Sequence, residues 1–363
     1  MTPTRPITLE TIQSIKPYKG GDSTLDTERV IKLSSNESPF GCSPAAKAAG
    51  LRAMEHPELY PDGGHLELRQ AISKTYGLPV DQIICGAGSD EVISLFIKGF
   101  CPTDSEIIHT THAFAMYHIY ALGGGVHPVA VAEKAFRADV SSILDAINEK
   151  TSAVFLANPN NPTGTWLDRD EIAYLIDRLP PHILLVLDGA YAEYLETEDR
   201  YDPGYQYVTS HPNVAVTGTC SKVHGLGGLR VGWGAASVDI VTTLNKIRGP
   251  FNVSAVGLAA AAAGISDTSW WRQQVVTSNQ TKDEFCQFLT EHQLRYIPSG
   301  GNFVTVLLAD ADQAQNLDER LRSDGIITRR IAGYGIPEGL RISMGTSEDM
   351  KLVCEVLESW HQG

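Results

Sequence analysis

Short apolar runs separated by helix-period segments dominate the middle of the chain. Between about residues 80 and 240 each run is hydrophobic throughout, which is typical of strands buried on both faces of a parallel sheet. The strand-like runs span 83–85, 106–109, 126–131, 153–157, 183–187, 214–217 and 229–233, and helical periodicity occurs over 89–99, 114–122, 138–149 and 168–179. This order predicts an α/β fold in which helices cover both faces of a mainly parallel, seven-stranded sheet.

The two ends of the chain carry different patterns. Residues 1–40 are polar and turn-rich apart from a strand-like stretch at 30–33, and Ser43-Pro44 has the N-cap and first-turn proline of a helix that ends near residue 54. Later segments predict an alanine-rich helix at 255–264, a long helix near 270–292, and a βαβ-like stretch over 303–308, 311–323 and 326–329. We therefore predict an N-terminal arm with part of a small domain (1–44), a large domain (45–250), and the rest of a small α+β domain (251–363). The small domain would thus be built from both chain ends, and we place the alanine-rich helix in its interior.

Composition and charge narrow the class of function. The 363 residues have ordinary globular composition, with 29 basic and 43 acidic residues and a net charge of −14. Neither a basic excess nor a Lys/Arg run is present, so we expect no nucleic-acid or membrane partner and favour a small-molecule substrate. The first ten residues lack the apolar segment of a signal peptide, and the six cysteines are scattered without a CxxC pair, which indicates free thiols in a reducing compartment. We expect a cytoplasmic protein.

In open α/β sheets, ligands bind beyond the carboxyl ends of the strands, so the residues that follow each strand are the first candidates for chemistry. After 83–85 comes Gly86-Ala87-Gly88-Ser89-Asp90-Glu91, where two glycines and a helix start could receive an anion. It matches neither GxGxxG nor a P-loop, and taken alone it is better explained as a glycine turn with Ser89 as N-cap. After 153–157, the run 158–164 (NPNNPTG) forms a rigid loop that fixes side-chain amides, which indicates a functional loop.

Two further strand ends carry ionisable groups. The run 183–187 leads directly into Asp188, so a carboxylate lies partly desolvated at the end of the sheet, where it needs a cationic partner. A simple turn-capping aspartate explains this equally well. After 214–217 come Thr219, Ser221 and Lys222, followed by a glycine loop and Arg230. Most lysines lie on the surface, but a lysine among hydroxyl groups and near an arginine has the setting that Schiff-base chemistry requires.

Together these motifs resemble the fold type I family of pyridoxal-phosphate (PLP) enzymes, the aspartate-aminotransferase-like family. The match rests on Asn161-Pro162-Thr163-Gly164, on Asp188-x-x-Tyr191, and on Ser221-Lys222 followed by Arg230. Within that fold the chain resembles the histidinol-phosphate aminotransferases over nearly its whole length, in the segments 33–41, 60–64, 88–91, 158–164, 248–254, 301–303 and 340–346. The resemblance implies a PLP-dependent enzyme that exchanges an amino group between glutamate or 2-oxoglutarate and histidinol phosphate or its ketone.

The same resemblance implies a role for each matching residue. Lys222 would bind PLP covalently and move the proton, and Asp188 would pair with the pyridine nitrogen. Asn161 and Tyr191 would bind the ring oxygen, and Phe114 would stack on the ring. The cofactor phosphate would lie against Ala87, Gly88, Ser89, Asp90, Thr219, Ser221 and Arg230, and it would be contacted by Tyr60 of a neighbouring subunit. A homodimer with shared active sites is therefore implied.

On the substrate side the resemblance implies contacts from Tyr18 of the other subunit, Asn36, Arg329 and Arg341. Arg341 matches an arginine that holds a carboxylate in amino-acid substrates and a phosphate in histidinol phosphate, and a planar guanidinium can grip either anion. Whether Arg329 or its neighbour Arg330 contacts substrate stays open. Several positions depart from the family pattern, namely His112, Gly189, Cys220 and Val223-His224. None of them removes a catalytic group, but they affect substrate preference.

Other readings of the sequence stay open. An aromatic amino acid (Phe/Tyr) aminotransferase shares many of these motifs. A non-catalytic PLP-sensing regulator is an alternative from another class, although such proteins carry a DNA-binding domain for which the chain has no basic region. His109, His112 and His118 could suggest a metal, but without a carboxylate or cysteine near them in the sequence they are better explained by packing, and we predict no metal site.

Overall fold

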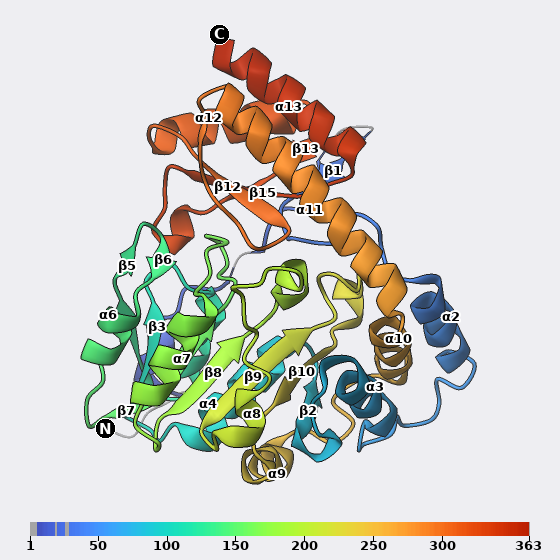
Figure 1. Cartoon of the computed structure of the whole chain (residues 1–363), viewed down its shortest axis with the longest axis vertical. Helices are drawn as coiled ribbons and strands as arrows, with labels where there is room; N and C mark the ends of the chain where they lie inside the picture. Colours follow the sequence, from blue (N-terminus) through green and yellow to red (C-terminus); the bar gives the residue numbers. More distant parts are fainter. Residues whose placement is uncertain (1–5, 19, 26–28, 363) are drawn as a thin grey trace.

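The computed structural model describes residues 6–18, 20–25 and 29–362. The chain forms a larger part, drawn at the bottom of Figure 1, and a smaller part above it. The described residues form one seven-stranded sheet in the order β2-β10-β9-β8-β7-β3-β4. Its strands are β2 (Ile83–Gly86), β3 (Glu106–Thr110), β4 (His127–Val131), β7 (Thr151–Ala157), β8 (Leu184–Asp188), β9 (Val214–Thr219) and β10 (Gly232–Ala235). All neighbours pair in parallel except β10, which is antiparallel to β2 and β9. The predicted mainly parallel sheet is confirmed.

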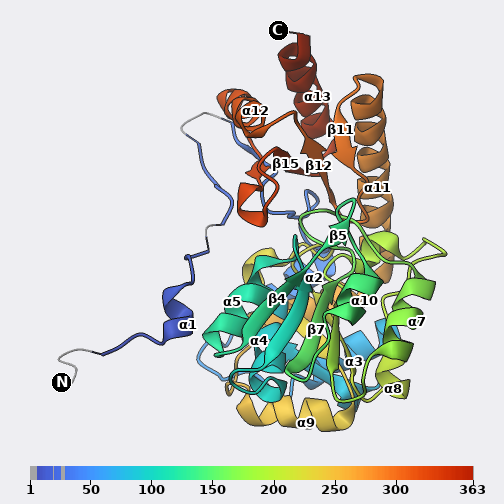
Figure 2. The ribbon, with the colours of Figure 1, turned by 90° about the vertical axis from the view of Figure 1, so that its left-hand side faces the viewer.

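Helices cover both faces of this sheet because its strands are apolar on both sides. Within β7, Val154 and Leu156 belong to one core cluster and Ala153 and Phe155 to the other. The first face packs against α3 (Leu66–Tyr76), α6 (Val140–Asp145), α7 (Arg169–Arg178), α8 (Tyr207–Ser210) and α10 (Ala255–Ser266). The second packs against α4 (Ser89–Phe100), α5 (Ala115–Gly123) and α9 (Val238–Ile247), and the two layers are visible edge-on in Figure 2.

The smaller part of the molecule contains segments from both ends of the chain. Its antiparallel sheet has the order β11-β12-β15-β14, formed by β11 (Arg295–Ile297), β12 (Phe303–Leu307), β15 (Gly339–Ser343) and β14 (Arg329–Arg330). Helices α11 (Thr268–Glu291), α12 (Ala311–Ser323) and α13 (Ser347–Gln362) pack on it. The N-terminal strand β1 (Ile31–Lys32) pairs in parallel with β13 (Ile326–Ile327), and Ile31 and Leu33 enter the same core. Near the N-terminus, helix α1 (Glu10–Gln13) lies beside α5 (Figure 2).

The remaining elements are short. They are α1 (Glu10–Gln13), α2 (Pro44–Ala53), β5 (Glu133–Lys134), β6 (Arg137–Ala138), η1 (Val80–Gln82), η2 (Ala192–Leu195), η3 (Gly227–Leu229) and η4 (Ala332–Tyr334). Ser43 caps α2 as predicted, since its side chain accepts a hydrogen bond from the amide of Ala46. Of the helices in the described ranges, none combines the length and the apolar character that crossing a bilayer would need.

Three details differ from the sequence prediction. The second βαβ-like stretch does not form a parallel pair: β12 and β14 both lie antiparallel to β15, which separates them, and β13 pairs with β1 instead. The strand expected at 229–233 begins at Gly232, because η3 and the left-handed Arg230 (φ 53°) occupy the preceding residues. The helix expected over 138–149 is only α6, which Asp139 caps.

The alanine-rich helix also packs differently. α10 lies against α2 and α3, and its buried Ala260, Ala261 and Ile265 belong to the core beneath the large sheet rather than to the small domain. Small side chains allow this close approach: a Cβ added to Gly264 would lie 3.3 Å from the Cβ of Ala46. The domain boundary near residue 250 itself stays a prediction.

Candidate active site

The carboxyl ends of the central strands surround a cavity of about 120 Å³. Five chain segments meet there: the start of α4 after β2, the segment between β3 and α5, the loop after β7, the end of β8 with the residues that follow, and the loop after β9. The predicted residues that line it are Ser89, Asp90, Phe114, Asn161, Asp188, Tyr191, Thr219, Ser221, Lys222 and Arg230. Parallel strands end at one edge of a sheet, and the structure thus brings these distant positions together.

Asp188 lies at the base of this cavity and is only 4% exposed. Its Oδ2 accepts a hydrogen bond from the Tyr117 hydroxyl (2.7 Å), and its Oδ1 accepts from the Thr217 hydroxyl (2.9 Å) and the Ala190 amide (3.2 Å). Burial raises the pKa of this carboxyl, which the hydrogen bonds from Tyr117 and Thr217 only partly oppose. A buried carboxylate held by neutral donors is suited to a cationic nitrogen in the cavity.

The start of α4 forms an anion cradle with the loop after β9. Gly88 is the N-cap at φ 84°, and a Cβ there would lie 2.6 Å from Nη2 of Arg230, so this position requires glycine. The Arg230 guanidinium donates to the Ser221 hydroxyl (3.3 Å) and to Asp90 (3.1 Å). Ser89 is the first helical residue and not the N-cap that the sequence suggested, and the Ala87 amide already donates to Glu91 (2.6 Å).

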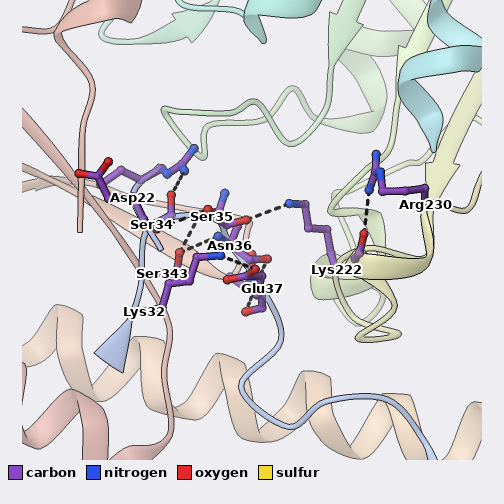
Figure 3. Close-up of polar contacts among 12 residues, drawn as sticks. Asp22, Lys32, Ser34, Ser35, Asn36, Glu37, Lys222, Arg230 and Ser343 are labelled. Atoms are coloured by element: carbon purple, nitrogen blue, oxygen red, sulfur yellow. Dashed lines mark hydrogen bonds and ion pairs between the residues drawn. The ribbon is translucent and has the colours of Figure 1, made fainter. Parts of the chain in front are cut away.

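Lys222 extends from the loop after β9 toward the N-terminal segment, as Figure 3 shows. Its Nζ donates to the Ser35 carbonyl (3.2 Å) and lies 5.6 Å from the centre of the Tyr191 ring. The Tyr191 hydroxyl accepts a hydrogen bond from Nδ2 of Asn36 (2.9 Å). A tight turn fixes the lysine, since Gly225 (φ 65°) packs so closely on residue 41 that a Cβ would lie 1.9 Å from the Gly41 carbonyl oxygen.

A second, wider cavity of about 470 Å³ shares residues of the first, among them Asn161 and Lys222, and opens toward the small domain. It is lined by four predicted substrate residues, Tyr18, Asn36, Arg329 and Arg341, and by Ala87 and Tyr334. Tyr18 belongs to the same chain, whereas the resemblance implied the Tyr18 of another subunit. Asn36 is fixed in place, because its backbone N–H donates to the Ser343 hydroxyl (2.8 Å) and its backbone is left-handed at φ 56°.

Arg341 lines the wider cavity and contacts Asn161, which lines both cavities. It is 5% exposed, donates from Nη1 to the Asn161 side-chain oxygen, and donates from Nη2 to the Ser34 carbonyl (2.8 Å). Among the described residues its buried Nε has no hydrogen-bond partner, and burial lowers the pKa of the guanidinium. A buried cation with an unused donor is prepared to bind an anion.

The structure separates the two neighbouring arginines. Arg329 pairs with Arg341 across β14 and β15 and lines the wider cavity. Arg330 turns to α12 instead, where it donates to the Gln315 side chain (3.2 Å) and the Ala311 carbonyl (3.3 Å). Geometry therefore favours Arg329 over Arg330 as a ligand contact.

Tyr60 lines neither cavity of its own chain. It is 82% exposed and stacks on Phe251, with ring centroids 4.7 Å apart. Sequence reasoning assigned no role to Tyr117, Thr217 or Tyr334. Tyr117 and Thr217 both lie near predicted site residues in sequence, but their contact with Asp188 becomes evident only once the strands and α5 are packed.

Comparison with known proteins identifies the family. The family model described as aminotransferase class I and II matches residues 28–357. The chain is 43% identical over 350 residues to the histidinol-phosphate aminotransferase of Granulibacter bethesdensis, which covers 96% of this chain and 94% of that protein. It is likewise 43% identical over 352 residues to the histidinol-phosphate aminotransferase of Ruegeria pomeroyi, with 97% of each chain covered. This chain belongs to the class I and II aminotransferases.

The fold of this aminotransferase also matches solved structures. The histidinol-phosphate aminotransferase of Sinorhizobium meliloti, crystallised with pyridoxal-5'-phosphate, superimposes with a TM-score of 0.89 at 27% identity, covering 98% of this chain and 97% of that one. The predicted fold type I architecture is thereby confirmed.

The histidines considered as metal ligands have other contacts in this aminotransferase. His112 Nδ1 lies 2.8 Å from Oε2 of Glu133, a carboxylate that comes close only through the fold, and His109 Nδ1 lies 2.8 Å from the Thr110 carbonyl. Within the described ranges no group of three or more His, Cys, Asp or Glu side chains could hold a metal ion.

Proposed function

We propose that this aminotransferase uses PLP to interconvert histidinol phosphate and 2-oxoglutarate with imidazole-acetol phosphate and glutamate, a step of histidine biosynthesis. The observation that carries the choice of substrate is the full-length identity of 43% to two proteins named for that reaction. The geometry of the two cavities supports it independently, because one is suited to the cofactor and the other to an anionic substrate.

The residues of the narrower cavity fit PLP. They offer a primary amine, a buried carboxylate without a cationic partner, an aromatic ring and a helix start beside an arginine, which match the aldehyde, ring nitrogen, ring face and phosphate of PLP. When bound, PLP supplies an electron sink for the substrate α-carbon and carries the amino group between the two half-reactions.

Each side chain then has a defined task. Lys222 would provide the amine that holds the cofactor and would then take the α-proton of the substrate, and the charge of Asp188 would keep a proton on the ring nitrogen. The hydroxyl of Tyr191 and the amide of Asn161 would bind the ring oxygen, and Phe114 would cover the ring face. Backbone amides at Gly88 to Asp90, together with the side chains of Ser89, Thr219, Ser221 and Arg230, would bind the phosphate, whereas the Ala87 amide is already bonded to Glu91.

The wider cavity binds and orients the substrate. Arg341 binds the phosphate of histidinol phosphate in one half-reaction and a carboxylate of glutamate in the other, using the Nε that lacks a partner. Arg329 adds a second positive charge at the same end, and Tyr18 and Asn36 form the walls of the cavity. Because both anions bind the same guanidinium, one site can serve both substrates.

We further propose a cytoplasmic homodimer with shared active sites. Tyr60, Leu59, Leu51, Met54 and Phe251 are all exposed apolar or aromatic side chains. Such a patch is typical of an interface between subunits. Tyr60 would then reach the cofactor phosphate of the partner subunit, which explains why it lies outside the cavities of its own chain.

The test is a set of single half-reactions. The purified holoenzyme is mixed separately with histidinol phosphate, phenylalanine and tyrosine, and the absorbance of the bound cofactor is followed. We expect histidinol phosphate to convert the cofactor far faster than either amino acid. Equal rates would overturn the substrate assignment in favour of an aromatic amino acid aminotransferase, and a cofactor that binds without any turnover would favour a non-catalytic PLP sensor.

A further inference from the structure

A separate cavity of about 260 Å³ is formed by α3, η2, α11 and the segment after η2, and we call it the rear cavity. Its lining includes the aromatic side chains of Tyr76, Tyr201, Tyr205 and Trp271 and the carboxylates of Glu193 and Glu196. None of these residues lines either active-site cavity. The rear cavity therefore combines aromatic walls with negative charge in a part of the molecule that transamination does not use.

Glu193 is the buried charge of this cavity. It is 5% exposed, and its Oε1 accepts a hydrogen bond from the Tyr76 hydroxyl (2.8 Å). Among the described residues, the one basic side chain within ion-pair distance is His224, whose Nε2 lies 3.9 Å from Oε1. Burial lowers the pKa of His224 to about 4, so this ring is neutral near pH 7 and does not offset the carboxylate.

Burial accordingly raises the pKa of Glu193 to about 7, with Glu196 adding to the rise. The hydrogen bond from Tyr76 only partly opposes it. Ionisation of a buried carboxylate without a cationic partner is unfavourable, and a cation that binds beside the carboxylate offsets this free energy. The contrast with Glu196 is clear, since that carboxylate already has its own cation, Arg272 (2.6 Å).

The walls are suited to the same kind of ligand. Aromatic ring faces attract cations, and cages of several rings are the usual recognition element for organic ammonium groups. Tyr76 packs edge-on against Tyr205, with ring centroids 5.5 Å apart, and the Arg272 guanidinium lies 5.1 Å from the Trp271 ring centre. The fold thus already places one cation against a ring of this cavity, at the side where Glu196 neutralises it.

We propose that the rear cavity binds a small organic cation, a protonated or quaternary amine or an imidazolium, with Glu193 as its counter-ion and the aromatic rings as its walls. A metal ion would need several oxygen ligands, whereas this cavity offers one buried carboxylate among rings. The site is connected to the catalytic segments: Glu193 follows Tyr191 by two residues, His224 follows Lys222 by two, and the Tyr201 hydroxyl donates to the Asn158 carbonyl (2.7 Å).

The experiment uses tetramethylammonium chloride as the probe, titrated into the holoenzyme without substrate and followed by calorimetry and tryptophan fluorescence. Sodium chloride at equal ionic strength and the near-isosteric neutral molecule tert-butanol are the reference ligands. We expect saturable binding of tetramethylammonium, and affinity lower by roughly tenfold or more in Glu193→Gln, which keeps the size and the acceptor for Tyr76. The exposed Glu198 in the same segment gives the control Glu198→Gln, which should bind like the parent.

Three results would overturn the proposal: no saturable binding, equal affinity in Glu193→Gln, or binding of tert-butanol as tight as that of tetramethylammonium. Cofactor absorbance and thermal unfolding show whether the variant is folded. If Glu193→Gln does not fold, Tyr205→Leu is tested in its place. Loss of this aromatic ring should weaken the binding of tetramethylammonium and leave the binding of tert-butanol unchanged. Since no substrate is present, the outcome is independent of the amino donor and acceptor proposed above.

Discussion

The two ends of the active site are built in different ways. The cofactor end is made by the large domain alone, from residues that follow β2, β3, β7, β8 and β9 at one edge of one sheet. The substrate end combines that edge with Tyr18 and Asn36 from the N-terminal segment and Arg329 and Arg341 from the small domain. One end is therefore fixed by strand pairing, and the other depends on how two domains and the N-terminal segment come together.

The side chains at the two ends are held by different numbers of contacts, so we expect them to affect different steps of the reaction. Asp188 accepts three hydrogen bonds from its own domain, which hold the carboxylate in one orientation. Arg341 is held by one contact from each direction, Asn161 of the large domain and Ser34 of the N-terminal segment. We expect substitutions at the cofactor end to change the rate of the chemical step, and those at the substrate end to change substrate binding.

The largest effect should come from Lys222→Ala, which removes the amine at the junction of both ends. Transamination should be abolished with every substrate, since no other primary amine lines the narrower cavity among the described residues. Steady-state rates and the absorbance of bound cofactor measure this. Substantial turnover by a variant free of parent enzyme would contradict the assigned mechanism.

Asp188→Asn should have the next largest effect, confined to the cofactor end. The amide has nearly the same shape but no charge, so it cannot hold a proton on the ring nitrogen, and we expect kcat to fall by about two to three orders of magnitude. PLP affinity should fall as well, and it is measured by cofactor absorbance during dialysis. The exposed Asp145→Asn is the control, and a kcat near the parent value in Asp188→Asn would refute the role of the carboxylate.

Arg341→Lys tests the substrate end. A lysine places its donors on one nitrogen and cannot grip an anion with a planar fork while keeping the contacts to Asn161 and Ser34, so KM for histidinol phosphate should rise by about one to two orders of magnitude, with PLP affinity unchanged. The neighbouring Arg330→Lys is the matched control, because that side chain contacts α12, and it should keep the parent KM. Equal effects of the two substitutions would contradict the assignment of Arg341, rather than Arg330, as the residue that binds the anion.

Sequence reasoning reached the cofactor end more fully, for a physical reason. A buried strand followed by glycines, an asparagine loop, a carboxylate or a lysine is a local pattern, and the topology of parallel sheets then brings such patterns together. The contacts that complete the end are not local: Tyr117 meets Asp188 across 71 residues, and Thr217 meets it across 29. Neither bond leaves a trace in hydrophobic periodicity.

The substrate end was accessible only through family resemblance. β14 and β15 are antiparallel neighbours, so Arg329 faces Arg341 by register, but the sequence predicted a parallel βαβ unit at 303–329 instead. That topology would not have brought these arginines together. The rear cavity had no signature at all, because its aromatic and acidic residues come from α3, η2, α11 and the segment between η2 and α8.

The smallest effect should come from Tyr117→Phe, which sharpens the comparison within the cofactor end. The ring keeps its packing against Phe155, and the carboxylate of Asp188 loses one of its three donors. Because an ionised carboxylate with fewer donors is less stable, the pKa of Asp188 should rise further and its hold on the ring-nitrogen proton should weaken. A hydrogen bond of this kind contributes about 1–3 kcal/mol, so kcat should fall roughly fivefold to a hundredfold, with KM nearly unchanged.

A pH titration of the bound cofactor's absorbance separates this role from a purely structural one. In Tyr117→Phe the midpoint should shift relative to the parent enzyme, while the exposed Tyr174→Phe should leave it in place. A variant with lower kcat but the same midpoint would show that Tyr117 acts through packing of α5 alone. The hydrogen bond from the Tyr117 hydroxyl would then not contribute to the charge of Asp188, and the carboxylate alone would hold the proton on the ring nitrogen.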